Sequence, residues 1–166
     1  MENEKFVLAV YVDNVAGVLT RITAMFTRRG FNIDALTVAE TERSEYSRIT
    51  VTMSGDEYVR QQLITQLKKL VVVKKVEVLE TESIKRELML IKVNNDSQNR
   101  SDIMTAVDVF RASVIDYAPD SMCIEVTGAP SKMDAFVKLM QPFGIMEMCR
   151  TGVVALDRGN TTLLNK

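Results

Sequence analysis

The sequence contains no histidine, and this absence excludes the kinds of site that depend on an imidazole ring. Histidine is the commonest general base near neutral pH and the commonest protein ligand of transition metals. Serine-type catalytic triads and most zinc sites are therefore not expected. No pair of carboxylates and no nucleophile beside a base stands out elsewhere, so the sequence predicts no catalytic residue and no metal ligand in this chain.

Cysteine is scarce as well, since the chain has only Cys123 and Cys149. They do not form the CxxC pair that metal and dithiol sites use. We expect two buried free thiols in a reducing compartment. The start, MENEK, lacks the apolar core of a secretory signal, and no stretch reaches the ~18 apolar residues that a membrane span needs. These features predict a cytoplasmic protein.

Neither sign of charge is in excess, because 21 Lys and Arg against 22 Asp and Glu give a net charge of −1. The chain therefore lacks the positive field that attracts nucleic acid or anionic lipid, and we expect neither partner. Proline and glycine are few, with 3 and 7 residues, while 46% of the 166 residues are hydrophobic. This composition is typical of a globular protein with one average domain or two small ones.

The first half of the sequence alternates strand-like and helix-like segments in the order βαββαβ. Apolar and β-branched runs predict strands at residues 6–12, 31–39, 46–53 and 71–79. Apolar residues at three- and four-residue steps predict helices at 18–29 and 55–70. This order predicts a four-stranded antiparallel sheet with both helices on one face, the ferredoxin-like arrangement.

The same order returns after the polar break at residues 81–83. Strands are predicted at 87–93, 114–117, 122–127 and 144–156, the last as one long strand. Helices are predicted at 101–112 and from Pro130 onward. We therefore predict an α+β protein of two tandem ferredoxin-like domains, residues 1–80 and 81–166.

The segment most informative about function is DNVAGVL, residues 13–19, which joins the first predicted strand to the first predicted helix. Free backbone amides at a helix start attract anions, and Gly17 lets a ligand approach with no Cβ in the way. Asn14 offers an amide oxygen and an amide nitrogen beside that anion site. Apolar walls are supplied by Val15, Val18 and Leu19. The segment fits a site for a small zwitterion, but taken alone it is more typical of a turn that only caps the helix.

A second asparagine, Asn32, lies in GFNID, within a run that otherwise favours a strand. Asparagine is disfavoured in strands unless its amide has a partner. It can face solvent or occupy a bulge. If Asn14 and Asn32 lie near one sheet edge, they form a polar clamp for a zwitterion.

Three stretches carry a resemblance to a known family: DNVAGVLTRITAMFTRRGFNID in the first half, and FRASVID and RTGVVALDRG in the second. They resemble the small regulatory subunits of acetolactate synthase, also called acetohydroxyacid synthase, along essentially the whole chain. The first half resembles an ACT domain, a module that binds amino acids at subunit interfaces. Many regulators share the ACT turn, but its combination with a second ferredoxin-like half and with the segment 150–154 is more specific.

The resemblance implies a non-catalytic protein that binds a catalytic subunit, raises its activity and transmits feedback inhibition by a branched-chain amino acid, usually valine. It implies no cofactor in this chain, whereas thiamine diphosphate, magnesium and FAD belong to the catalytic subunit. It also implies a homodimer in which two ACT domains join their sheets side by side. No ligand residues are assigned to the second domain.

In that family the effector lies at the dimer interface, between the strand-to-helix turn of one chain and the following strand of the other. Matched residue by residue, the turn consists of Asn14, Val15, Ala16, Gly17, Val18 and Leu19. The strand contributes Asn32 and Ile33. Which branched-chain amino acid is preferred stays open, because one methylene is worth only about 1–3 kcal/mol in an apolar pocket.

The main alternative is a free-standing ACT-type amino-acid sensor that regulates transcription or another enzyme, since such modules are widely reused. No helix-turn-helix segment or basic stripe supports a link to DNA. An enzyme or an RNA-binding protein of this fold is a further alternative, but the aromatic and basic motif of RNA readers is absent. We interpret Asp34, Glu40 and Glu42 as solvated charges of loops and edges.

Overall fold

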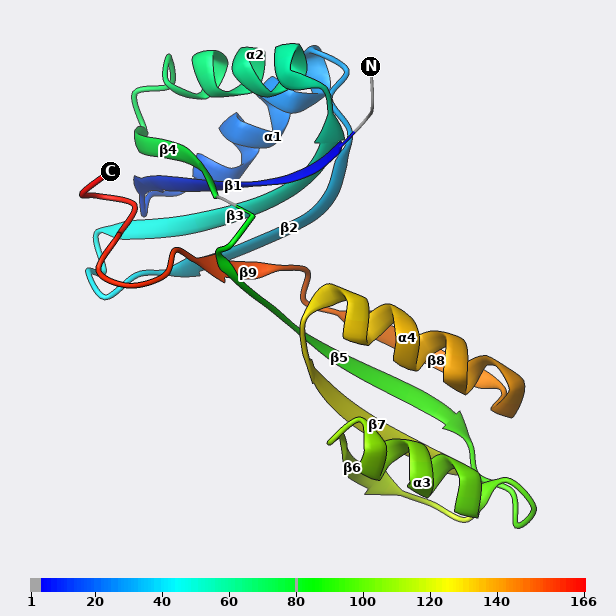
Figure 1. The fold of residues 1–166 in the computed structure, drawn as a ribbon. Coiled ribbons are helices and arrows are strands. Elements are labelled where there is room, and N and C mark those ends of the chain that lie inside the picture. The colour runs from blue at the N-terminus through cyan, green and yellow to red at the C-terminus, as the bar shows by residue number, and fades with distance from the viewer. Residues whose placement is uncertain (1–3, 80) are drawn as a thin grey trace. The chain divides into compact units, whose positions relative to one another are not determined.

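The computed structural model describes residues 4–79 and 81–166, which form two compact units. Unit 1 combines the chain up to Ile84 with the C-terminal segment Val153–Lys166, and unit 2 is Lys85–Gly152. Each unit has an antiparallel sheet and two α-helices, as Figure 1 shows. The predicted α+β class with two βαββαβ units is confirmed.

Unit 1 holds two helices against a four-stranded sheet. Its elements are β1 (Glu4–Asp13), α1 (Val18–Arg28), β2 (Ile33–Glu40), β3 (Tyr46–Gly55), α2 (Glu57–Leu67) and β4 (Val73–Leu79). The strand order is β2-β3-β1-β4, and every neighbouring pair is antiparallel. The two edges of the sheet are therefore β2 and β4.

The core of unit 1 follows from the alternation of side chains along β1. Leu8, Val10 and Val12 point to the helices because side chains alternate with a period of two along a strand. They pack against fully buried side chains of α1 and α2, among them Phe26 and Leu63. Burial of each such side chain contributes about 1.5–3 kcal/mol to folding.

The opposite face of β1 is buried as well, by the far end of the chain. Val7, Ala9 and Tyr11 form a second cluster with Val153, Ala155 and Leu163 of residues 153–166, which we call the C-terminal strap. Figure 1 shows the strap on the face of the unit 1 sheet opposite its two helices. Its strand β9 is Val154–Leu156. The sequence analysis had assigned this segment to the second domain, whereas in the structure it packs with the first unit.

Side chains of the sheet also hold the strap by polar contacts. Arg48 of β3 donates from Nη2 to the carbonyl oxygen of Ala155 at 2.8 Å, and Lys75 of β4 donates to the carbonyl oxygen of Lys166 at 2.6 Å. Burial lowers the pKa of the Arg48 guanidinium, and the Asp157 carboxylate opposes that shift. The strap is therefore an integral part of unit 1.

Unit 2 repeats the arrangement. Its elements are β5 (Ile84–Asn94), α3 (Arg100–Val109), β6 (Ser113–Tyr117), β7 (Ser121–Gly128), α4 (Pro130–Met140), the 3-10 helix η1 (Gln141–Phe143) and β8 (Ile145–Arg150). The strands run in the order β6-β7-β5-β8, again antiparallel. Met89, Ile91 and Val93 of β5 pack against buried residues of both helices, including Ile103 and Phe136.

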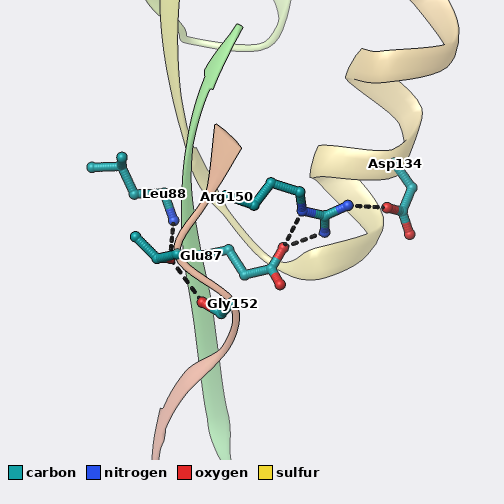
Figure 2. A network of polar contacts seen from close by, with 6 residues as sticks. Glu87, Leu88, Asp134, Arg150 and Gly152 are labelled. Carbon is teal, nitrogen blue, oxygen red and sulfur yellow. Dashed lines mark hydrogen bonds and ion pairs between the residues drawn. The ribbon is translucent and has the colours of Figure 1, made fainter. Parts of the chain in front are cut away.

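A charged network fixes the end of unit 2, as Figure 2 shows. Glu87 of β5 is only 6% exposed and accepts hydrogen bonds from Nε and Nη2 of Arg150 on β8. Arg150 also donates from Nη1 to Asp134 of α4 at 2.8 Å. The backbone N–H of Thr151 then donates to the carbonyl oxygen of Leu88 at 3.0 Å. Three elements are thereby joined where the chain leaves the unit.

Further predictions at this level were wrong. The predicted long strand 144–156 ends at Arg150, because Gly152 has φ 79 and a strand cannot continue through that conformation. The second helix ends at Leu67 rather than at residue 70. The cysteines are not buried, since Cys123 is half-buried and Cys149 is exposed. The domain boundary predicted at residue 80, and the N-terminal residues 1–3, lie outside the described residues.

Candidate functional site

Helix α1 starts from a turn that leaves its N-terminal end uncapped. Gly17 is the N-cap residue with φ 78 and ψ 3, a conformation that glycine adopts without the strain other residues bear. No side chain caps the helix, and its first turn contains no acidic residue. A Cβ added to Gly17 would meet no heavy atom within 4 Å. The space beside the glycine is therefore open, and the backbone rather than crowding requires a glycine here.

Several backbone N–H groups of this turn are free. Val18 donates to the carbonyl oxygen of Val15 at 3.2 Å, and Arg21 donates to that of Gly17 at 3.1 Å. In contrast, the N–H groups of Ala16, Gly17, Leu19 and Thr20 in this turn have no acceptor among residues 4–79 and 81–166. Free N–H groups at the positive end of a helix dipole form a site for an anion such as a carboxylate.

Helix α2 of the same unit shows what a capped helix looks like. Its N-cap residue, Asp56, accepts a hydrogen bond from the backbone N–H of Val59 at 2.9 Å, and Glu57 adds a negative charge to the first turn. These carboxylates satisfy the helix end in the usual way. In α1 the equivalent negative group is missing, so a ligand can supply it.

Asn14 connects the turn to the hairpin between β2 and β3. Its Nδ2 donates to the carbonyl oxygen of Ser44 at 2.9 Å and to Oε2 of Glu40 at 3.3 Å. Its backbone N–H donates to the carbonyl oxygen of Glu45 at 2.7 Å. The two acceptors determine the amide orientation, because a flipped amide would place its oxygen against two other oxygens. Oδ1 of Asn14 is thereby left as an acceptor for a ligand.

The apolar residues of the turn divide into two groups. Val15 is 49% exposed and Leu19 is half-buried, so both can contact a ligand. Val18 is only 8% exposed and belongs to the core of unit 1. Ala16 is exposed beside them. The structure thus brings the predicted turn residues together. Val18 packs beneath the turn in the core and does not form part of its surface.

Asn32 and Ile33 lie at the other end of α1. The helix has 11 residues, which separates its ends by about 16 Å. Asn32 is exposed, and Ile33 is half-buried at the start of β2. A single chain therefore does not bring Asn32 to the turn around Asn14, and the predicted polar clamp does not form within one copy.

Strand β2 connects these two places along the edge of the sheet. It begins next to Asn32 and ends at Glu40, which contacts Asn14. The strand contains no proline and no lysine, the residues that commonly protect an edge from pairing. If two copies pair antiparallel through β2, the start of one strand lies beside the end of the other. Asn32 and Ile33 of the second copy would then lie beside the turn of the first.

Comparison with known proteins gives a consistent result over both halves. Residues 8–75 match the family described as an AHAS small subunit-like ACT domain, and residues 86–159 match the family described as the small subunit of acetolactate synthase. A protein of Archaeoglobus fulgidus named "Probable acetolactate synthase small subunit" is 46% identical over 156 residues, which cover 94% of this chain and 98% of that protein. The chain belongs to the acetolactate synthase small-subunit family.

Other members of this family agree in length and in fold. The acetolactate synthase small subunit of Mycobacterium bovis is 43% identical over 160 residues, covering 96% of this chain and 95% of that protein. The crystal structure of the acetolactate synthase small subunit from Thermotoga maritima superposes with a TM-score of 0.88 at 36% identity, covering 95% of this chain and 99% of that chain. The two βαββαβ units are thus shared with a solved member of the family.

Residues 4–79 and 81–166 contain no group of three or more Cys, Asp or Glu side chains placed to hold a metal ion. None of the helices in this part of the chain is both long enough and apolar enough to span a membrane. The candidate site of unit 1 is the uncapped turn at the start of α1, with its free N–H groups.

Sequence reasoning missed one residue of this site. Glu40 is exposed on the edge strand, as interpreted, but its carboxylate also accepts a hydrogen bond from Asn14 at the turn. The two residues are 26 positions apart, so no local pattern brings them together. Only the placement of β2 beside the start of α1 does so.

Proposed function

We propose that this chain is the regulatory partner of an acetolactate synthase catalytic subunit. It raises the activity of that subunit and transmits feedback inhibition by a branched-chain amino acid, with valine as the first candidate. Membership of the small-subunit family supports the partner, and the uncapped start of α1 is the observation that supports an effector site. Thiamine diphosphate, magnesium and FAD belong to the catalytic subunit in this proposal, and this chain supplies no catalytic residue.

The effector is anchored by charge and selected by its apolar side chain. Its carboxylate accepts hydrogen bonds from the free N–H groups of Gly17 and Leu19. The N–H of Val18 takes no part in this, because it is already bonded to the carbonyl oxygen of Val15. The branched side chain of the effector contacts Val15 and Leu19, which are the accessible apolar residues of the turn.

The site is shared between two copies that pair through β2. The distance of about 16 Å along α1 supports this arrangement, because Asn32 and the turn cannot meet in one chain. A bound effector then contacts both copies and adds free energy to one dimer geometry only. Coupling of this kind to a partner subunit is worth about 1–3 kcal/mol, so inhibition requires no chemistry in this chain.

Reconstitution with the catalytic subunit tests the proposal. The purified chain is mixed with the catalytic subunit of the same organism, and acetolactate formation is followed with and without valine, leucine and isoleucine. We expect the chain to stimulate acetolactate formation when no amino acid is added, and at least one of the three amino acids to inhibit it. If the chain causes neither stimulation nor inhibition, the result would favour the free-standing amino-acid sensor instead.

A further inference from the structure

We infer that Glu40 makes the effector site specific for ligands that carry an ammonium group beside their carboxylate. This inference deepens the proposed function and rests on it. It assigns to one side chain the distinction between an amino acid and a carboxylic acid of the same shape.

Two carboxylates lie next to the turn, and they differ in their partners. Asp13 immediately precedes it and forms an ion pair with Nζ of Lys74 at 2.8 Å. Glu40 accepts only the neutral amide of Asn14, and no cation of the described residues lies within ion-pair distance of it. The charge of Asp13 is therefore compensated inside the protein, whereas that of Glu40 is available to a ligand.

Asn14 aligns this charge with a second acceptor. Because both N–H groups of its amide donate to the hairpin, its Oδ1 and the Glu40 carboxylate are neighbouring acceptors at the turn. An ammonium group has three N–H donors. In the paired arrangement, the amide oxygen of Asn32 from the second copy adds a third acceptor at the same end of β2.

The turn consequently has two ends of opposite character. The free N–H groups of Gly17 and Leu19 favour a carboxylate, and the oxygens of Glu40 and Asn14 favour a cation. A zwitterion satisfies both ends. A simple carboxylic acid brings a negative charge close to an uncompensated carboxylate, and this repulsion selects against it.

A charge-neutral variant with a matched control tests the assignment. Glu40→Gln keeps an oxygen that can accept from Asn14 but removes the charge, and Glu42→Gln removes another exposed charge two residues further along. Titration calorimetry measures the Kd of valine and, by competition, that of isovalerate, which has the same branched side chain and no ammonium. We expect Glu40→Gln to raise the Kd of valine about tenfold and to leave isovalerate unchanged or tighter. Glu42→Gln should change neither Kd by more than about twofold.

The outcomes separate this inference from the function on which it rests. If the unaltered chain binds valine and Glu40→Gln preserves the ratio of the two Kd values, the role of Glu40 is refuted and the proposed function stands. Equal weakening of both ligands would show a structural role for Glu40 and would also overturn the inference. If the unaltered chain binds none of the three branched-chain amino acids, alone or with the catalytic subunit, the proposed function fails as well.

Discussion

Substitution of Gly17 by aspartate tests the effector site most directly, because the structure allows its two effects to be separated. The first effect is on folding. Any L-residue at φ 78 is strained by about 1–2 kcal/mol. No steric clash adds to this cost, since a Cβ at this position has open space around it.

The second effect is on binding, because the new carboxylate lies where the effector carboxylate is expected. Two negative charges about 4 Å apart repel by about 1 kcal/mol in water and about 4 kcal/mol at an effective dielectric constant of 20. The Kd of valine should therefore rise between about fivefold and a thousandfold. The aspartate of Gly17→Asp also competes for the free N–H groups, as Asp56 occupies those of α2.

Gly159 in the C-terminal strap provides the matched control. It has φ 68 and equally open surroundings, so Gly159→Asp carries the same backbone strain far along the chain from the turn. Calorimetry should show weakened valine binding for Gly17→Asp alone, and inhibition of acetolactate formation by the complex should require correspondingly more valine. Urea unfolding should show comparable losses of stability for both variants. A Gly17→Asp chain that remains fully sensitive to valine would refute the placement of the carboxylate.

Three further predictions concern sharing of the site, the strap and the charged network. Asn32→Ala alone should weaken valine binding. An equal mixture of Asn32→Ala and Gly17→Asp chains should regain about a quarter of the sites, because about half of the dimers are mixed and each mixed dimer has one intact site of two. Calorimetry that shows no recovery would mean that the site is not shared. Leu163→Ala removes a side chain that is 5% exposed and should cost about 2–4 kcal/mol in urea unfolding, whereas Leu164→Ala, at 52% exposed, should cost under about 1 kcal/mol. Arg150→Met leaves the buried carboxylate of β5 without its cation and should destabilise the chain by about 2–4 kcal/mol, and an unchanged urea midpoint would contradict this.

Local patterns in the sequence were sufficient to predict most elements of the fold. The apolar spacing of Ile22, Met25 and Phe26 predicted α1, and these three residues are buried in the structure. The uninterrupted apolar run 6–12 predicted a strand, but the pattern did not show which segments cover its two faces. Helices cover one face, and the other is covered by residues about 150 positions further along, which no local pattern reveals.

The candidate site was predictable only where its residues are contiguous. Asn14 and Gly17 lie within one turn, and turn chemistry identified them. The distance between Asn14 and Asn32 depends on the length and direction of α1, so the sequence left open whether one chain or two would bring them together. The contact with Glu40 depends on which strand forms the edge of the sheet, and this is a property of the whole unit.

The strap also determines the order in which the two units can finish folding during synthesis. All residues of unit 2, Lys85–Gly152, emerge from the ribosome before Val153–Lys166. The second unit can therefore finish folding while the first still presents Val7, Ala9 and Tyr11 to solvent on a bare sheet face. A nascent chain released before residues 153–166 are made would leave this apolar surface exposed, so synthesis of the strap is the step that protects the first unit from aggregation.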